Sequence, residues 1–168
     1  MSIRLGNPER LRRRYRPARV RLLFIGESPP ASGRFFYRQD SGLYRAIRDA
    51  FRVADPSITD DTFLEIFQRS GCYLIDACAA PVDRLHAHLR RAACLAAEPS
   101  LTRTIRRLEP DTIVTLVKSI RDNVQRAAVR ARWRGPILDV PYPGRWASHR
   151  KIFLERLTPH LEHLCAGR

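Results

Sequence analysis

The chain has 168 residues, 44% of them apolar, and this size and composition suit one globular domain with its own core. Its 31 Lys and Arg residues outnumber 17 Asp and Glu residues, which gives a formal net charge of +14 at pH 7. Such an excess in a small domain favours a polyanionic partner, nucleic acid first, over a merely solvated basic surface. No segment approaches the roughly 20 apolar residues of a membrane-spanning helix, so we expect no membrane association.

Residues 1–19 carry many arginines and lack the apolar stretch of a secretory signal. We therefore expect a cytoplasmic, monomeric protein with a basic N-terminal arm (1–19) followed by the folded domain (20–168). The arm could bind phosphate, act as a transit-like extension or be a solvated tail.

Apolar runs predict four short β-strands, at 20–25, 72–77, 112–117 and 137–140. Helical patterns lie between them. Leu43, Ile47 and Phe51 repeat at four-residue spacing, and a second helix around Phe63 ends before Gly71.

Further helices are expected at 85–97, 101–108, 120–132 and 148 to about 164. Pro99 separates the first two and Pro159 interrupts the last, because proline removes a helical hydrogen bond. Strands that alternate with helices predict an α/β fold: a single domain with a central four-stranded parallel sheet and helices on both faces.

Ligands in open parallel sheets bind beyond the carboxyl ends of the strands, and three of the four predicted strand ends carry unusual residues. They are Gly26-Glu27-Ser28-Pro29-Pro30 after the first, Asp76 after the second, and PYPGRWASHR (141–150) after the fourth. The third ends in Val117-Lys118-Ser119, which is typical of an ordinary strand-to-helix turn. Each segment alone also suits a plain turn or a capping residue.

The cysteines, Cys72, Cys78, Cys94 and Cys165, form no C-x-x-C pair and no zinc-type pattern with histidine. Buried, reduced thiols are the interpretation we favour. His86 and His88 lie two residues apart, on different faces of a helix, so we expect no metal site.

Together these segments resemble the uracil-DNA glycosylase superfamily. Its members follow the first strand with a loop such as GQDPYH or GEAPG, where this chain has GESPP. They close with a segment such as HPSPLSAHR, which YPGRWASHR matches without a gap. In this alignment Tyr142 takes the place of the first His, Trp146 that of the intercalating Leu, and His149-Arg150 that of the terminal His-Arg.

The resemblance also implies roles for other residues. Phe35 or Phe36 would stack on the flipped base, and Asp76 stands where members have a base-reading Asn. Glu27 falls at the acid of the GEAPG type, flanked by Gly26 and Ser28 in the base-binding loop. Members of that type hold an iron–sulfur cluster through four cysteines, two of them N-terminal, but this chain has none before Cys72. We therefore expect no cluster and no other cofactor.

Cleavage of an N-glycosidic bond develops positive charge on the sugar and negative charge on the departing base. Glu27 could orient or deprotonate the attacking water, or stabilise the sugar cation. Tyr142 or His149 could donate a hydrogen bond to the base oxygen.

Asp76 raises a question of hydrogen-bonding pattern. Uracil offers an N–H between two carbonyl oxygens, and an ionised carboxylate satisfies only the N–H. Either Asp76 is protonated, or a backbone N–H serves the oxygen, or the base has adjacent N–H donors like guanine. The alternative role is a capping Asp in a loop.

Aromatic residues near the first loop fit either a core or a stacking platform, and alternation along an extended segment lets one of Phe35 and Phe36 point inward while the other faces a pocket. Trp146 lies between Arg145 and the Ser-His-Arg segment ending at Arg150, a poor place for a core residue. As a wedge it would fill the gap left by a flipped nucleotide.

The sequence therefore predicts a DNA glycosylase that flips and hydrolytically removes a deaminated base, uracil first, from DNA. The leading alternative is a non-catalytic nucleic-acid-binding protein that retains this fold. A third possibility is a hydrolase of free nucleotides or nucleosides, for which an intercalating segment would serve no purpose.

Overall fold

The computed structural model describes residues 7–144 and 146–166. Within these residues four parallel strands form one sheet, in the order β2-β1-β3-β4. The strands are β1 (Leu22–Gly26), β2 (Cys72–Asp76), β3 (Thr112–Thr115) and β4 (Ile137–Asp139). The predicted α/β fold and the four strand positions are confirmed.

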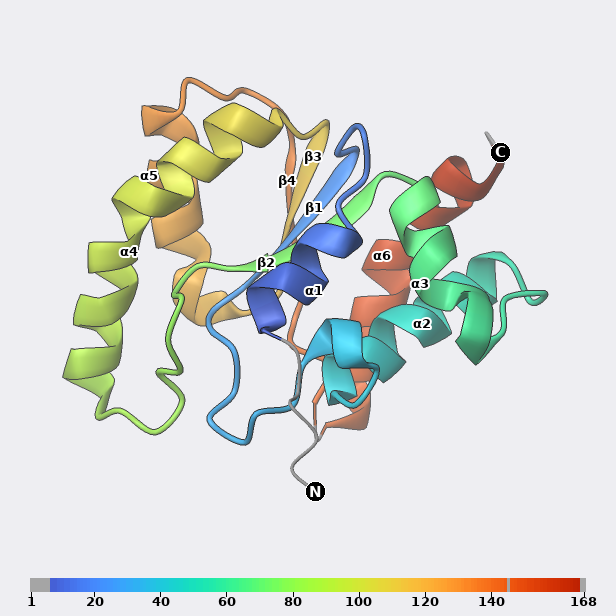
Figure 1. Ribbon diagram of the computed structural model, residues 1–168, viewed down its shortest axis with the longest axis horizontal. Helices are drawn as coiled ribbons and strands as arrows, with labels where there is room; N and C mark the ends of the chain where they lie inside the picture. The colour runs from blue at the N-terminus through green and yellow to red at the C-terminus, as the bar shows by residue number, and fades with distance from the viewer. Residues whose placement is uncertain (1–6, 145, 167–168) are drawn as a thin grey trace.

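Helices cover both faces of this sheet (Figure 1). On one side lie α4 (Ala87–Leu108) and α5 (Arg121–Arg130), and on the other α2 (Gly42–Ala54), α3 (Asp60–Arg69) and α6 (Ala147–Ala166). Short 3-10 turns, η1 (Phe36–Arg38) and η2 (Lys118–Ile120), follow the first and third strands. Because both faces are covered, every residue of β1 is buried, which explains its continuous apolar run.

Local signals account for the start of the two helices after the first loop. The Ser41 side chain accepts a hydrogen bond from the Tyr44 N–H at the start of α2. Thr59 and Thr62 form a capping box at the start of α3. Gly71 then ends that segment with φ +78, a left-handed conformation that suits glycine.

The two predicted proline breaks are wrong. α4 continues through Pro99 and α6 continues through Pro159. In α4 the residues on both sides of the proline, including Cys94 and Leu101, are buried against the same core. Packing of this kind outweighs the roughly 3 kcal/mol that an interior proline costs a helix.

A buried ion-pair cluster adds to that packing around Pro99. Glu98 is 1% exposed and accepts hydrogen bonds from α5: Asn123 Nδ2 at 2.9 Å, Arg126 Nη2 at 2.7 Å and Arg130 Nη1 at 2.7 Å. These bonds lower the pKa of Glu98 although its burial acts in the opposite direction. The cluster therefore ties α4 to α5 at the point where the proline would otherwise break the helix.

Part of the basic N-terminal segment is helical. α1 (Pro8–Arg14) begins at Asn7, whose side chain accepts a hydrogen bond from the Glu9 N–H. The following Tyr15 ring stacks on Tyr37 at a centroid distance of 5.6 Å. Gln68 Nε2 donates to the carbonyl oxygens of Arg14 and Arg16, each at 3.1 Å. This segment is thus docked on η1 and α3. None of the described helices is long and apolar enough to cross a membrane.

Candidate active site

The strand register brings the chemically unusual strand ends together. Gly26 pairs with Asp76 at the carboxyl end of the two neighbouring strands. A cavity of about 340 Å³ opens there, within the usual range for small-molecule sites. Seven of the residues singled out in the sequence line it: Gly26, Glu27, Ser28, Phe35, Phe36, Asp76 and Tyr142.

Glu27 is 8% exposed and its carboxylate is held on several sides. Arg90 Nε donates to Oε1 at 3.0 Å and to Oε2 at 2.9 Å, and Arg90 Nη2 also donates to Oε2. Ser119 Oγ donates to Oε1 at 2.8 Å. A two-pronged bond to guanidinium fixes both the position and the orientation of a carboxylate. Glu27 therefore enters the cavity as a rigidly positioned anion paired with a cation.

The loop after β1 is fastened to the loop after β2. Ser28 Oγ accepts a hydrogen bond from the Val82 N–H at 3.1 Å, and Asp83 accepts from the Ala31 N–H at 3.1 and 3.2 Å. Ser28 thus lines the cavity, but its hydroxyl already accepts a hydrogen bond that joins the two loops.

Asp76 lies at the wall of the cavity, with a side chain that is 11% exposed. Its Oδ2 accepts a hydrogen bond from Arg12 Nη2 at 2.9 Å. Burial raises the pKa of Asp76 from 3.8 to about 6, although Arg12 acts to lower it and Glu9 raises it further. Both the protonated and the ionised form of Asp76 are consequently accessible near neutral pH.

The raised pKa predicts that Asp76→Asn stabilises the fold in a pH-dependent way. An unfolded Asp ionises near 3.8, but the folded one ionises only near 6, so wild-type stability falls as the pH rises between these values. Above about pH 7 the variant should therefore be more stable by up to about 3 kcal/mol, and near pH 3, below both pKa values, the two proteins should be about equal. Urea denaturation at both pH values measures this difference, and a difference that does not change with pH would contradict the assignment.

The two phenylalanines differ in their surroundings. Phe36 packs among core rings, with centroids at 5.1 Å from Phe67 and 5.8 Å from Tyr44. Phe35 contacts one core ring, Tyr37, at a centroid distance of 5.6 Å, and it also has a cationic neighbour, since the guanidinium carbon of Arg12 lies 5.4 Å from its ring centroid. Both rings line the cavity and both are buried. Because Phe36 is packed among several core rings, Phe35 is the better candidate for a stacking surface.

The segment after β4 is divided between the cavity and the surface. Tyr142 lines the cavity but is 45% exposed, and the partial burial of its ring raises the pKa of the phenol above the usual value. Trp146, directly before α6, is 63% exposed, and His149 and Arg150 are exposed on the first turn of that helix. None of these three lines the cavity, and Arg145 lies outside the described residues.

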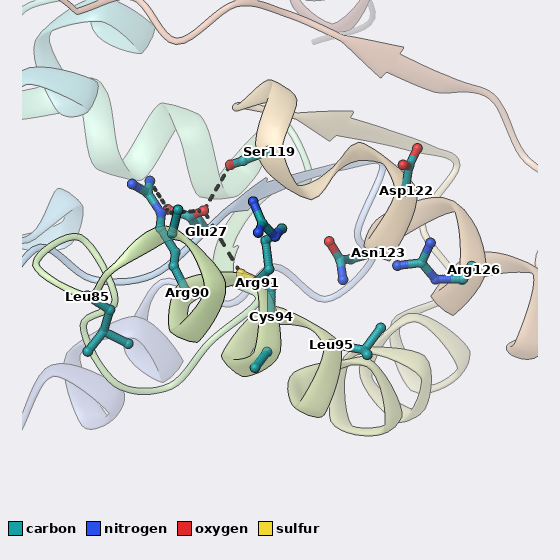
Figure 2. A pocket seen from close by; sticks show the side chains of 12 residues that line it. Glu27, Leu85, Arg90, Arg91, Cys94, Leu95, Ser119, Asp122, Asn123 and Arg126 are labelled. Carbon is teal, nitrogen blue, oxygen red and sulfur yellow. Dashed lines mark hydrogen bonds and ion pairs between the residues drawn. The ribbon is translucent and has the colours of Figure 1, made fainter.

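Glu27 also lines a second cavity, of about 730 Å³ (Figure 2). It is bounded by α4 and α5 and shares Glu27 and Arg90 with the smaller cavity. Exposed Leu85 and Leu95 line it, but Asp76 and the phenylalanines do not. Figure 2 shows the bonds from Arg90, Ser119 and Cys94 to Glu27.

Three of the cysteines, Cys72, Cys78 and Cys94, are buried, as expected, and Cys165 is only partly buried. Cys78 Sγ lies 3.7 Å from Cys94 Sγ, and burial raises the pKa of Cys78 to about 12. An iron–sulfur cluster needs four thiolates, and no group of three or more metal-binding side chains gathers among the described residues. The side chains that the structure describes therefore do not fit such a cluster.

Sequence reasoning missed three residues of this site. Ser119 follows β3 at the same sheet edge as the other strand ends, so the expectation of an ordinary turn at 117–119 is wrong. The rule that ligands bind at this edge could have identified Ser119. Arg90 sits in a run of basic residues at the start of α4, where no motif distinguishes it. Arg12 approaches Asp76 from 64 residues away in the sequence.

A doubly covered parallel sheet with an acidic, aromatic-walled cavity at its carboxyl edge defines an α/β protein with a small-ligand site. In a comparison with protein families, residues 13–162 match the model of the Uracil DNA glycosylase superfamily. The match spans most of the chain, and the protein belongs to this superfamily. A search of curated proteins finds no significant match.

Proposed function

We propose that the protein is a DNA glycosylase that extrudes a deaminated base, uracil first, and hydrolyses its N-glycosidic bond to leave an abasic site. The observation that carries the proposal is the gathering of Glu27, Asp76 and Phe35 around one cavity of about 340 Å³ in a chain of this superfamily. An acid, a hydrogen-bonding group and an aromatic face are the groups that recognition and hydrolysis of a flipped base require.

Glu27 would act on the sugar side of the scissile bond. Its carboxylate oxygens already accept hydrogen bonds from Arg90 and Ser119, so orienting the water and stabilising the sugar cation are better roles than taking a proton from the water. Fixed bonds from Arg90 and Ser119 keep the carboxylate in place without reorganisation during the reaction.

Tyr142 is the better of the two candidates for stabilising the departing base. It lines the cavity, and its raised pKa keeps the phenol protonated and able to donate a hydrogen bond. His149 is exposed on α6 and does not line the cavity, so its contact would be to DNA.

Trp146 is suited to a wedge in the duplex. An exposed indole next to exposed Arg150 places apolar area and positive charge at one surface. Extruding a paired nucleotide costs a few kcal/mol, least for a mismatch and almost nothing in a single strand, and a wedge in the vacated stack offsets part of that cost.

Trp146→Ala should therefore slow excision most from uracil paired with adenine, less from uracil mispaired with guanine, and least from single-stranded DNA. Single-turnover rates on the three substrates measure this order. Val129→Ala is a matched control, because Val129 is an exposed apolar residue on α5, 64% exposed, and should alter none of the rates. Equal losses on all three substrates would mean that Trp146 supports the fold rather than the DNA contact.

The same ion pair that positions Glu27 also favours a second candidate, a non-catalytic DNA-binding protein. Three donated bonds from Arg90 and one from Ser119 use most of the acceptor capacity of the carboxylate. A protein that only binds DNA would show salt-dependent affinity and no abasic product.

Labelled oligonucleotides that carry uracil, hypoxanthine or xanthine distinguish the two candidates. The proposed glycosylase should produce alkali-labile sites at one or more of these bases. Binding without any such site would favour the second candidate.

A further inference from the structure

Asp76 is held by a residue that lies outside the cavity. Arg12 Nη2 donates to Asp76 Oδ2 at 2.9 Å, and Arg12 Nη1 donates to Glu9 Oε2 at 2.7 Å. The two side chains of the first pair are 16% and 11% exposed, so water screens their interaction only weakly. Arg12 also lies one residue before the part of the chain that matches the superfamily.

The position of Arg12 is fixed by the docking of its helix. Its guanidinium lies over Phe35, Tyr15 stacks on Tyr37, and Gln68 binds the carbonyl oxygens that follow α1. Arg12 therefore keeps one arrangement relative to Asp76, unlike a solvated surface arginine.

The two oxygens of Asp76 have different environments. Oδ2 is bonded to Arg12. Oδ1 lies against the backbone of Gly26, so closely that a Cβ on that glycine would come within 2.9 Å of it. Gly26 and Asp76 line the smaller cavity and Arg12 does not. Arg12 thus holds the carboxylate through Oδ2 from outside the lining of the cavity, and Oδ1 lies beside Gly26, which belongs to that lining.

The charged and titratable groups around Asp76 come from three elements. Arg12 and Glu9 act on it from α1, with opposite signs. Tyr37 of η1 and Cys78 after β2 also interact with it, and both have raised pKa values that keep them neutral at physiological pH. Arg12 is therefore the group that offsets the cost of burying the Asp76 charge.

We propose that Arg12 is a positioning residue that determines base specificity, by holding Asp76 as an ionised acceptor whose Oδ1 meets an N–H of the flipped base. The proposal rests on the function proposed above and adds a residue and a rule of base choice to it. An ionised carboxylate accepts from an N–H but repels a neighbouring carbonyl oxygen.

This rule distinguishes two deaminated bases. Uracil has its N–H between two carbonyl groups, whereas the corresponding N–H of hypoxanthine has a carbonyl on one side and a C–H on the other. Ionisation of Asp76 should thus penalise uracil more than hypoxanthine, so the preference for uracil proposed above should be strongest below the Asp76 midpoint and weaken above it. The ratio of hypoxanthine to uracil excision rates should rise with pH through the titration of Asp76.

A titration of the Asp76 side-chain carbon by ¹³C NMR tests the role of Arg12 without any catalysis, with Asp76→Asn used to assign the signal. Arg12→Gln keeps a hydrogen-bond donor but removes the charge, and it should raise the Asp76 midpoint by at least about one pH unit. Arg12→Lys restores the charge and should bring the midpoint back towards the wild-type value. Arg13→Gln is the matched control: it removes an exposed arginine of the same helix that pairs with Glu9 at 3.4 Å, and should leave the midpoint unchanged.

The rate ratio provides the second readout. In Arg12→Gln its rise should move to higher pH by the same interval as the NMR midpoint, and in an Asp76→Asn background the Arg12 change should no longer affect it. An unchanged Asp76 midpoint in Arg12→Gln would overturn the inference. So would a shifted midpoint with no matching shift in the pH dependence of the rate ratio. If the midpoint shifts and no base is excised, Arg12 controls Asp76 as inferred and the proposed glycosylase function is the part that fails.

Discussion

Glu27→Gln is expected to excise uracil at least about tenfold more slowly than the wild type in single-turnover assays, the scale on which a positioned acid or base contributes. The amide has one acceptor oxygen in place of two, so it cannot accept all the bonds that Arg90 and Ser119 donate to the carboxylate. The change also removes the negative charge proposed to act on the sugar and leaves the guanidinium partly uncompensated. DNA binding, measured by fluorescence anisotropy, should persist because the proposed DNA contacts lie elsewhere.

Two further variants serve as comparisons for Glu27→Gln. Asp122→Asn removes the charge of an exposed carboxylate that lines only the larger cavity, and it should leave the rate unchanged. Ser119→Ala removes one of the bonds to Glu27 and should cause a smaller loss than Glu27→Gln. An unchanged excision rate in Glu27→Gln would mean that Glu27 takes no part in the mechanism. Loss of both folding and DNA binding would assign Glu27 a structural role.

Asp76→Asn should excise uracil at least about tenfold faster than the wild type near pH 8, and at the same rate near pH 5. With a pKa of about 6, only about one Asp76 side chain in a hundred is protonated at pH 8, whereas Asn always offers a donor and an acceptor. Single-turnover rates across this pH range measure the effect.

Two other outcomes would each assign Asp76 a different role. A collapse of activity at every pH would make it an ionised catalytic base. A rate that does not change at any pH would reduce it to a residue that caps the loop after β2.

Much of the fold follows from local sequence patterns. The apolar runs of β1, β2 and β3 are legible because strands covered on both faces need apolar side chains throughout. The predicted break at Pro99 is wrong because contacts that are distant in the sequence hold the helix together there. The bonds from Asn123, Arg126 and Arg130 to Glu98 come from another helix, and no local pattern reveals them.

The candidate site, like the fold, could be predicted only in part from the sequence. Glu27 and Asp76 could be located because each ends a recognisable strand, and the edge of a parallel sheet brings such ends together. Their partners could not, since Arg90 lies 63 residues from Glu27 in the sequence and Arg12 lies 64 residues from Asp76. Sequence thus located the groups proposed to meet the base, and only the tertiary structure identified the cations that hold them.

The central claim is that the protein breaks the N-glycosidic bond of a deaminated base in DNA. The most direct test incubates excess protein with an oligonucleotide that contains one uracil, and quantifies the free base by mass spectrometry alongside the abasic strand. We expect free uracil and abasic sites to form in equal amounts, and Glu27→Gln to form both at least about tenfold more slowly. Tight, salt-dependent binding with neither product from the uracil, hypoxanthine or xanthine substrate would contradict it.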